Sequence, residues 1–308
     1  MPSVSRETTP PQVSDRWLAP VPPRVLTIAN QKGGVGKTTS AVNLAAALSQ
    51  HGLRALVIDL DPQGNASTAL AVPHAAGSPS MYDVVVKGKP LGDVVVAAPD
   101  LPGLCCAPAT IDLAGAEIEL VPVVAREMRL RKALTSYLRT AEVDYVIIDC
   151  PPSLGLLTVN ALVAAQEVLI PVQCEYYALE GLSQLVHTID LVQTELNPEL
   201  EISTLLLTMY DARTKLADAV AEDVRAHFGR RVLDTIIPRS VRISEAPGFG
   251  QTILSYDPGS RGARAYVQAA AELAAAAVSP APVQLSPVPQ RDTPEPRFHR
   301  PQEVQLHG

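Results

Sequence analysis

Residues 30–39 read Asn30-Gln31-Lys32-Gly33-Gly34-Val35-Gly36-Lys37-Thr38-Thr39, and this stretch decides the fold of the chain. It follows an apolar run, Val25–Ala29, and precedes a helical pattern over Thr38–Gln50. Glycines let the backbone turn tightly, so that successive N–H groups point toward one anion, and the helix N-terminus adds its partial positive charge. The order strand, loop, helix therefore predicts a phosphate-binding loop. In such a loop Lys37 reaches the β- and γ-phosphates of a nucleotide, and Thr38 ligates Mg²⁺.

Around this loop, short β-branched apolar runs alternate with helical patterns. Strands are predicted at Val25–Ala29, Ala55–Ile58, around Gly103–Ala107, Tyr145–Ile148, Val168–Val172, Ile202–Met209 and Val232–Ile237. Helices are predicted at Thr38–Gln50, Arg126–Arg139, Thr158–Ala165, Leu179–Leu196, Leu216–Phe228 and Ala263–Ala277. This alternation predicts an α/β fold, a mostly parallel twisted sheet with helices on both faces. Ligands of such sheets bind at the carboxyl ends of the strands.

Proline marks the edges of the folded part. Residues 1–23 contain six prolines and residues 279–308 contain seven of the 28 in the chain. Segments of this composition bury little apolar surface and interrupt helices and ladders, so we expect two disordered tails. The folded domain is then predicted over residues 24–278.

Composition excludes several classes of protein. Hydrophobic residues make up 47% of the 308 residues and charged residues 19%, which excludes a chain disordered throughout. The net charge of −7 argues against a protein that coats nucleic acid through overall basicity. Neither an apolar run of membrane-spanning length nor a secretory leader is expected. Scattered cysteines exclude a disulfide framework and a paired zinc site, so we expect a cytoplasmic protein.

Two further strands end in carboxylates. Asp59-Leu60-Asp61 follows the second predicted strand, and Asp149 ends the apolar run Val146-Ile147-Ile148. One aspartate of the first pair can help to hold Mg²⁺, while the other orients or activates an attacking water. An apolar strand that ends in aspartate is typical of a Walker B strand, so we expect Asp149 to bind Mg²⁺ directly or through water, together with Thr38.

The loop departs from the common phosphate-loop pattern at two positions. Gln31 stands where the first glycine belongs, and Lys32 is a second lysine beside it. This form, KGGVGKT, resembles the deviant Walker A loop of the P-loop ATPases that include ParA/Soj partition proteins, MinD and the nitrogenase iron protein. The resemblance implies that Lys32 reaches across an ATP-dependent homodimer to the phosphates bound by the other subunit.

Other segments resemble the chromosomal ParA/Soj group in particular. They are DLDPQGN at 59–65, DCPPS at 149–153 and IPRSVRISEAP at 237–247. The resemblance implies that Asp61 is catalytic together with Lys32 and Lys37, and that Asp59 has a supporting role at the metal. It also implies that ATP is bound by Lys32, Gly33, Gly34, Val35, Gly36, Lys37, Thr38 and Thr39, with the adenine near Met209, Pro238 and Arg239.

The same resemblance implies a DNA partner. Arg213 and Arg242 match surface arginines that contribute to ATP-dependent, non-specific binding of double-stranded DNA in the group. Residues 205–270 carry nine Lys or Arg against seven Asp or Glu, so this part of an acidic chain is weakly basic. The resemblance further implies a centromere-binding partner of the ParB type, which stimulates ATP hydrolysis, and a nucleoid-associated location without membrane binding.

Four alternatives remain open at this point. A MinD-like, membrane-associated positioning ATPase ends in a basic amphipathic helix, whereas Ala263–Ala277 is alanine-rich. A longer plasmid-type partition ATPase carries an N-terminal helix-turn-helix, which the proline-rich residues 1–23 cannot form. A ligase that forms amides or rings on this fold needs a pocket for a second substrate. A scaffold protein that binds the nucleotide without hydrolysing it is the fourth alternative, and Asp61 argues against it.

Overall fold

In the computed structural model of the chain, the described residues are 16–175 and 180–276. The predicted C-terminal tail and residues 1–15 of the predicted N-terminal tail lie outside them, as do two predicted helix ends, Leu179 and Ala277. Residues 16–23 have no regular secondary structure, and Trp17 among them stacks on His51 with ring centroids 4.0 Å apart. The first strand begins at Arg24, where the folded domain is predicted to begin.

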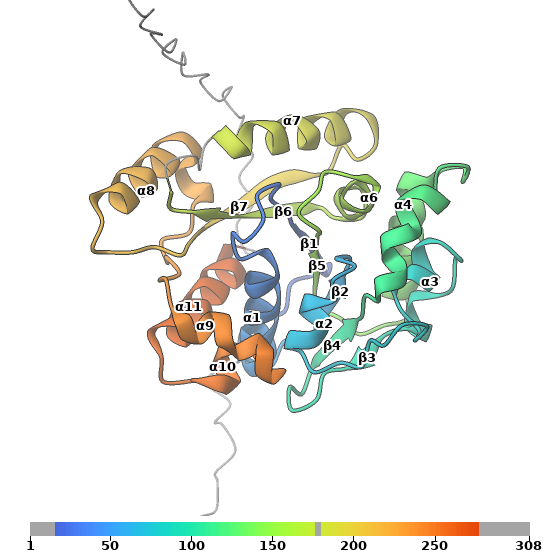
Figure 1. Cartoon of the computed structure of the whole chain (residues 1–308), viewed down its shortest axis with the longest axis horizontal. Helices are drawn as coiled ribbons and strands as arrows, with labels where there is room; N and C mark the ends of the chain where they lie inside the picture. Colours follow the sequence, from blue (N-terminus) through green and yellow to red (C-terminus); the bar gives the residue numbers. More distant parts are fainter. Residues whose placement is uncertain (1–15, 176–179, 277–308) are drawn as a thin grey trace, which may run out of the picture.

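The centre of the molecule is a twisted sheet with the strand order β3-β4-β2-β5-β1-β6-β7 (Figure 1). All neighbours pair in parallel except β3, a short edge strand that runs antiparallel to β4. The strands are β1 (Arg24–Ile28), β2 (Ala55–Asp59), β3 (Val96–Ala97), β4 (Leu104–Ala107), β5 (Tyr145–Asp149), β6 (Glu167–Gln173) and β7 (Glu201–Thr208). The predicted α/β class and the mostly parallel sheet are confirmed.

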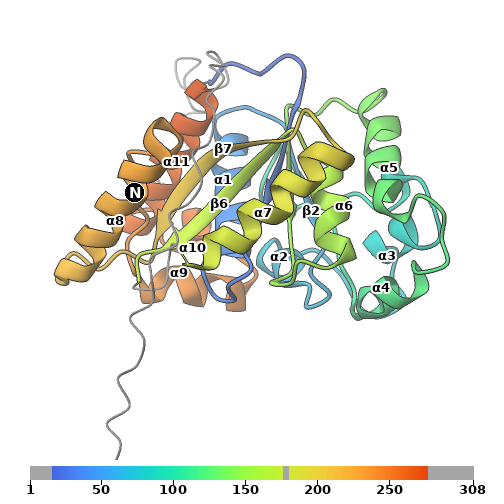
Figure 2. The ribbon, with the colours of Figure 1, turned by 90° about the horizontal axis from the view of Figure 1, so that it is seen from above.

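Helices cover both faces of this sheet, as Figures 1 and 2 show. They are α1 (Lys37–Gln50), α2 (Asn65–Ala69), α3 (Met81–Val85), α4 (Ala116–Glu119), α5 (Arg129–Leu138), α6 (Leu156–Ala164), α7 (Glu180–Glu195), α8 (Lys215–Phe228), α9 (Val241–Glu245), α10 (Ile253–Tyr256) and α11 (Arg261–Ala276). Short 3₁₀ turns lie at Leu91–Asp93, Ile111–Gly115, Arg126–Met128, Gly229–Arg231 and Ala246–Phe249.

Two hydrophobic cores lie on opposite faces of the sheet because consecutive strand residues point to opposite sides. Val25 of β1 belongs to the core under α3, α5, α6, α7 and α8, while Leu26 belongs to the core under α1 and α11. Both are essentially inaccessible to solvent. Strands buried on both faces explain why the sequence shows continuous apolar runs instead of alternation.

One predicted strand is absent from the described part of the chain. Val232–Ile237 makes only a single bridge, between Val232 and Leu205 of β7. The backbone N–H groups of Asp234 and Thr235 donate instead to the carboxylate of Glu272 on α11, at 2.7 and 3.0 Å. The Leu233 and Ile237 N–H groups still donate to the Leu205 and Leu207 carbonyls of β7, at 3.0 and 2.9 Å. Between them the Thr235 N–H donates to Glu272 instead of β7, so the segment follows β7 without forming a regular ladder.

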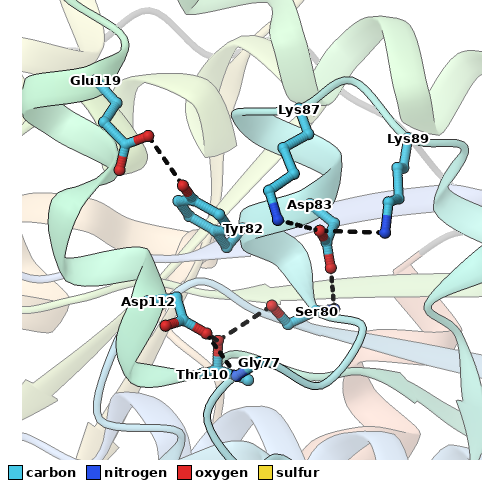
Figure 3. A network of polar contacts seen from close by, with 9 residues as sticks. All are labelled: Gly77, Ser80, Tyr82, Asp83, Lys87, Lys89, Thr110, Asp112 and Glu119. Atoms are coloured by element: carbon cyan, nitrogen blue, oxygen red, sulfur yellow. Dashed lines mark hydrogen bonds and ion pairs between the residues drawn. The ribbon is translucent and has the colours of Figure 1, made fainter.

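A polar network joins α3 to the segment that follows β4, as Figure 3 shows. The Tyr82 hydroxyl donates to Glu119 at 2.9 Å, and the hydroxyls of Ser80 and Thr110 lie 3.2 Å apart. Both contacts connect residues that are 30 or more positions apart in the sequence. They join α3 to the segment between β4 and the end of α4.

Asp83 is the charged centre of this network. Its Oδ1 atom lies 3.0 Å from Lys87 Nζ and 3.3 Å from Lys89 Nζ, and its Oδ2 atom accepts a hydrogen bond from the Ser80 backbone N–H at 3.2 Å. Burial acts to raise the pKa of Asp83, but the hydrogen bonds from Lys87, Lys89 and Ser80 outweigh burial and lower it.

We predict that Asp83→Asn destabilises the protein by about 1 kcal/mol near neutral pH, because an isosteric amide keeps the shape and loses the charge. The figure is small because both lysines are about half exposed, at 53% and 49%. The folded-state pKa lies below that of the unfolded chain. The contribution is therefore complete above about pH 4 and is lost as the pH falls through the folded-state value.

Urea unfolding of both proteins across this pH range measures the difference. Asp93→Asn, at an exposed aspartate on the 3₁₀ turn after α3, serves as the control and is expected to leave stability unchanged. An Asp83→Asn effect that stayed constant as the carboxylate protonates would contradict a charge-based contribution.

Candidate active site

The loop between β1 and α1, the blue segment in Figure 1, has the geometry of a phosphate cradle. Gly34 and Gly36 adopt φ values of +73° and +90°, which side chains with a Cβ rarely reach. A Cβ placed on Gly33 or Gly34 would meet no other atom of the described chain within 4 Å, so this side of the loop is open. The N-terminus of α1 begins immediately after, at Lys37, where its free N–H groups favour an anion.

Two side chains that the sequence analysis gave no role hold this loop in place. The Asn30 amide donates to the Pro171 carbonyl of β6 at 2.8 Å and accepts from the Lys32 N–H at 3.0 Å. The Thr208 hydroxyl at the end of β7 donates to the Val35 carbonyl at 2.9 Å. Both are buried polar residues at the ends of apolar strands, which is the sequence signal that could have identified them.

Lys37 lies under the loop and is only 7% exposed. Its ammonium group donates to the Lys32 carbonyl at 3.2 Å. Burial lowers the pKa of Lys37, while the negative charges of Asp149 and Asp61 act in the opposite direction. Lys37 therefore lies close enough to Asp61 and Asp149 to interact electrostatically with both carboxylates.

Asp59 and Asp149 stand side by side because they are the last residues of adjacent strands and share one register position. Both are completely buried, and burial raises the pKa of each carboxyl. Asp59 is well supplied with donors: its Oδ2 accepts from the Ser67 N–H and hydroxyl at 2.9 and 2.7 Å, and its Oδ1 accepts from the Asp61 N–H at 3.1 Å.

Asp149 has no comparable support. Neither carboxylate oxygen has a hydrogen-bond partner of normal geometry among the described residues. The Thr38 hydroxyl and the Lys37 ammonium group oppose the rise of its pKa, but burial and the charge of Asp59 outweigh them. A buried carboxylate without partners is the kind of group that a divalent cation compensates.

The donor set suits Mg²⁺ bound together with a nucleotide. Among the described residues, no group of three or more His, Cys, Asp or Glu side chains converges on one point. Mg²⁺ is commonly held by one or two carboxylates, a hydroxyl and the phosphates of its substrate, so a complete protein cage is not required. Asp149 and Thr38 fit that role directly, and Asp59 fits a supporting one.

Asp61 sits two residues beyond β2 and is 8% exposed. Its Oδ1 atom accepts from the Gln63 N–H at 2.9 Å, which turns the chain sharply after the strand. Its charge acts on both Lys37 and Asp149, so the carboxylate faces the same site. It is thus placed beside the loop, where its predicted catalytic role requires it.

Lys32 points to a different neighbour. Its ammonium group lies 2.9 Å from Glu175 Oε2, and the two side chains are 40% and 49% exposed. Glu175 follows β6, which pairs with β1 in the sheet, so the two loops emerge next to each other. Glu175 is a further site residue that the sequence analysis did not identify.

The residues predicted near the adenine lie on two adjoining loops. Met209 follows β7 with φ +52°, and Tyr210 bridges to Pro238. The Arg239 N–H donates to the Tyr210 carbonyl at 2.9 Å. A hollow of about 330 Å³ opens here, and its lining includes Tyr210 and Pro238 together with Ala265 of α11.

Both predicted DNA-binding arginines are exposed, and both have acidic neighbours. Arg213 is 86% exposed and contacts the two oxygens of Asp211 at 2.8 and 2.7 Å. Arg242 is 61% exposed and lies 4.0 Å from both Glu245 and Asp257. The Tyr210–Pro238 bridge joins the segment that precedes Arg213 to the segment that precedes α9, the helix that carries Arg242.

Comparisons with known proteins place this site in a family. A family model described as an AAA domain matches residues 23–202. The sporulation initiation inhibitor protein Soj of Bacillus subtilis is 54% identical over 252 residues, which cover 82% of this chain and 98% of that protein. The chromosome partitioning protein ParA of Caulobacter vibrioides is 53% identical over 252 residues, which cover 82% and 94%.

Solved structures agree on the fold. Cobyrinic acid a,c-diamide synthase from Mycobacterium smegmatis, with a bound ATP analog and magnesium, is 39% identical with a TM-score of 0.70 and covers 82% of this chain and 94% of its own. The septum site-determining protein MinD of Pyrococcus horikoshii, complexed with Mg-ADP, is 25% identical with a TM-score of 0.66, over 81% and 95%. No helix of the described residues is long and apolar enough to cross a membrane.

Since this chain matches Soj and ParA over nearly their whole length at more than half identity, it belongs to the ParA/Soj family of chromosome-partitioning ATPases.

Proposed function

We propose that this protein separates chromosomes or plasmids by an ATP-driven cycle of dimerisation and DNA binding. The observation that carries the proposal is the cluster of Lys37, Asp59, Asp61 and Asp149 beneath the loop, in a chain 54% identical to Soj. ATP with Mg²⁺ binds one subunit, two subunits join face to face, and the dimer holds DNA. Hydrolysis then returns it to monomers that bind DNA weakly.

Each residue of the cluster has a distinct part in this cycle. The loop N–H groups and Lys37 hold the phosphates, and Lys32 reaches the phosphates of the other subunit. Thr38 and Asp149 would hold Mg²⁺, with Asp59 in support, and the ion would supply positive charge to the phosphates. Asp61 orients the attacking water and takes up its proton, as a carboxylate beside the phosphates can do.

DNA binding is assigned to the side of the molecule that carries Arg213 and Arg242. One subunit offers few phosphate contacts, and nearby carboxylates weaken them further. Two subunits joined through ATP double those contacts, so affinity for DNA depends steeply on dimerisation and on salt. The protein would then associate with the nucleoid only in its ATP-bound form.

Release requires a partner that accelerates hydrolysis. We assign this role to a centromere-binding protein of the ParB type, in keeping with the relatives named for chromosome partitioning. A membrane-associated function like that of MinD has weaker support, since MinD is 25% identical to this chain against 53% for ParA.

Co-sedimentation with DNA tests the proposal directly. We expect the full chain to sediment with DNA in the presence of Mg²⁺ and ATP, and to stay in solution with ADP or without nucleotide. Lys37→Ala, which removes the buried cation of the loop, is expected to abolish both nucleotide binding and sedimentation. Equal DNA binding in all three nucleotide conditions would contradict the proposed cycle.

Asp61→Ala is expected to keep nucleotide binding and to lower ATP hydrolysis by about a hundredfold or more, because a positioned base is lost. The variant should then accumulate as an ATP-bound dimer, which size-exclusion chromatography with light scattering measures. Normal turnover in this variant would transfer the role to another group.

Arg242→Glu is expected to weaken DNA binding at least about tenfold and to leave ATP-dependent dimerisation unchanged. Because each dimer loses two phosphate contacts, the slope of log affinity against log salt should fall by about 2. Arg139→Glu is the matched control, since Arg139 is exposed at the end of α5, far from α9 in Figure 2. Equal DNA affinities of the two variants would remove Arg242 from the DNA-binding face.

A further inference from the structure

We infer that Glu175 is a positioning residue for Lys32: within one subunit its carboxylate holds the ammonium group that the dimer needs. The ion pair must therefore break before two subunits can join. This inference rests on the proposed contact of Lys32 with the other subunit's phosphates. The inference adds an ion pair within each chain that opposes dimerisation.

The geometry restrains Glu175 more than an ordinary surface carboxylate. The Gln173 amide donates to its Oε1 atom at 2.6 Å, while its Oε2 atom lies 2.9 Å from Lys32 Nζ. The Glu175 N–H also donates to the Gln173 carbonyl at 2.8 Å, which closes a tight turn at the end of β6. Each carboxylate oxygen thus has its own partner.

The backbone of Lys32 is fixed independently of its side chain. Its N–H donates to Asn30 Oδ1 at 3.0 Å, and its carbonyl accepts from Lys37 Nζ at 3.2 Å. The side chain beyond Cα is 40% exposed and contacts Glu175 at its end. The ammonium group can therefore change partners while the phosphate loop keeps its shape.

The strength of the pair suits a switchable contact. An ion pair with both members this exposed shifts an equilibrium by only about two- to fivefold. One dimer requires two such pairs to break, and effects of distant sites multiply, so dimerisation is weakened by about 4- to 25-fold. Phosphate oxygens with more negative charge than one carboxylate can still replace Glu175.

Glu175→Gln tests the inference in the full chain. We expect the dimer dissociation constant, measured by sedimentation equilibrium with Mg²⁺ and a non-hydrolysable ATP analogue, to fall by about 4- to 25-fold. The affinity of the monomer for ADP should stay unchanged, because the ion pair competes only with the proposed contact between Lys32 and the phosphates of the other subunit. Glu175→Asp keeps the charge and should dimerise like the wild type.

Glu142→Gln is the matched control, because Glu142 also forms an exposed ion pair, with Arg54 at 2.5 Å, before β5 and away from the loop. An unchanged dimer constant in Glu175→Gln, with dimerisation lost in Lys32→Ala, would overturn the inference and leave the proposed function standing. Tighter binding of ADP by the Glu175→Gln monomer would also overturn the inference. The loss of a negative charge near the phosphates would then explain tighter dimerisation without any release of Lys32. Normal dimerisation of Lys32→Ala would overturn both.

Discussion

The burial of two neighbouring carboxylates at the ends of β2 and β5 is the constraint around which this site is built. Placing Asp59 and Asp149 at one register position takes both out of water; burial raises the pKa of each carboxyl, and the charge of Asp59 raises that of Asp149 further. Ser67 and the turn at Asp61 compensate Asp59 with hydrogen bonds. Asp149 has no hydrogen-bond partner of normal geometry among the described residues, and the charge of Lys37 only partly offsets its burial.

The strand order explains why these groups meet. β1 lies between β5 and β6, so the loop after β1 has Asp149 on one side and Glu175 on the other. β7 lies one strand further, and Thr208 at its end still reaches the Val35 carbonyl. Four parallel strands thus deliver their last residues to one edge, where the loop is fastened from several directions. The loop is thus held by hydrogen bonds from Asn30, Lys37 and Thr208.

Three exposed cations to which the proposed function assigns phosphate contacts share one property: each lies beside a carboxylate of its own chain. Lys32 pairs with Glu175, Arg213 with Asp211, and Arg242 lies near Glu245. Such exposed pairs contribute little to stability, and a phosphate can replace the carboxylate at small cost. In the proposed cycle, one such cation would bind phosphate weakly, and several cations brought together by dimerisation would bind it strongly.

The sequence by itself determined the α/β class, the phosphate loop and the strand-end aspartates, because backbone conformation and strand burial are written in local patterns such as Gly34, Gly36 and the run before Asp149. It also predicted a strand at 232–237, where the Asp234 and Thr235 N–H groups donate instead to Glu272, more than 35 residues away. Only the tertiary structure decided that contact, the anchoring of the loop by Thr208, and the pairing of Lys32 with Glu175. Their physical reason is the same: each partner lies far along the chain, where local propensity carries no information about which side chain will be a neighbour.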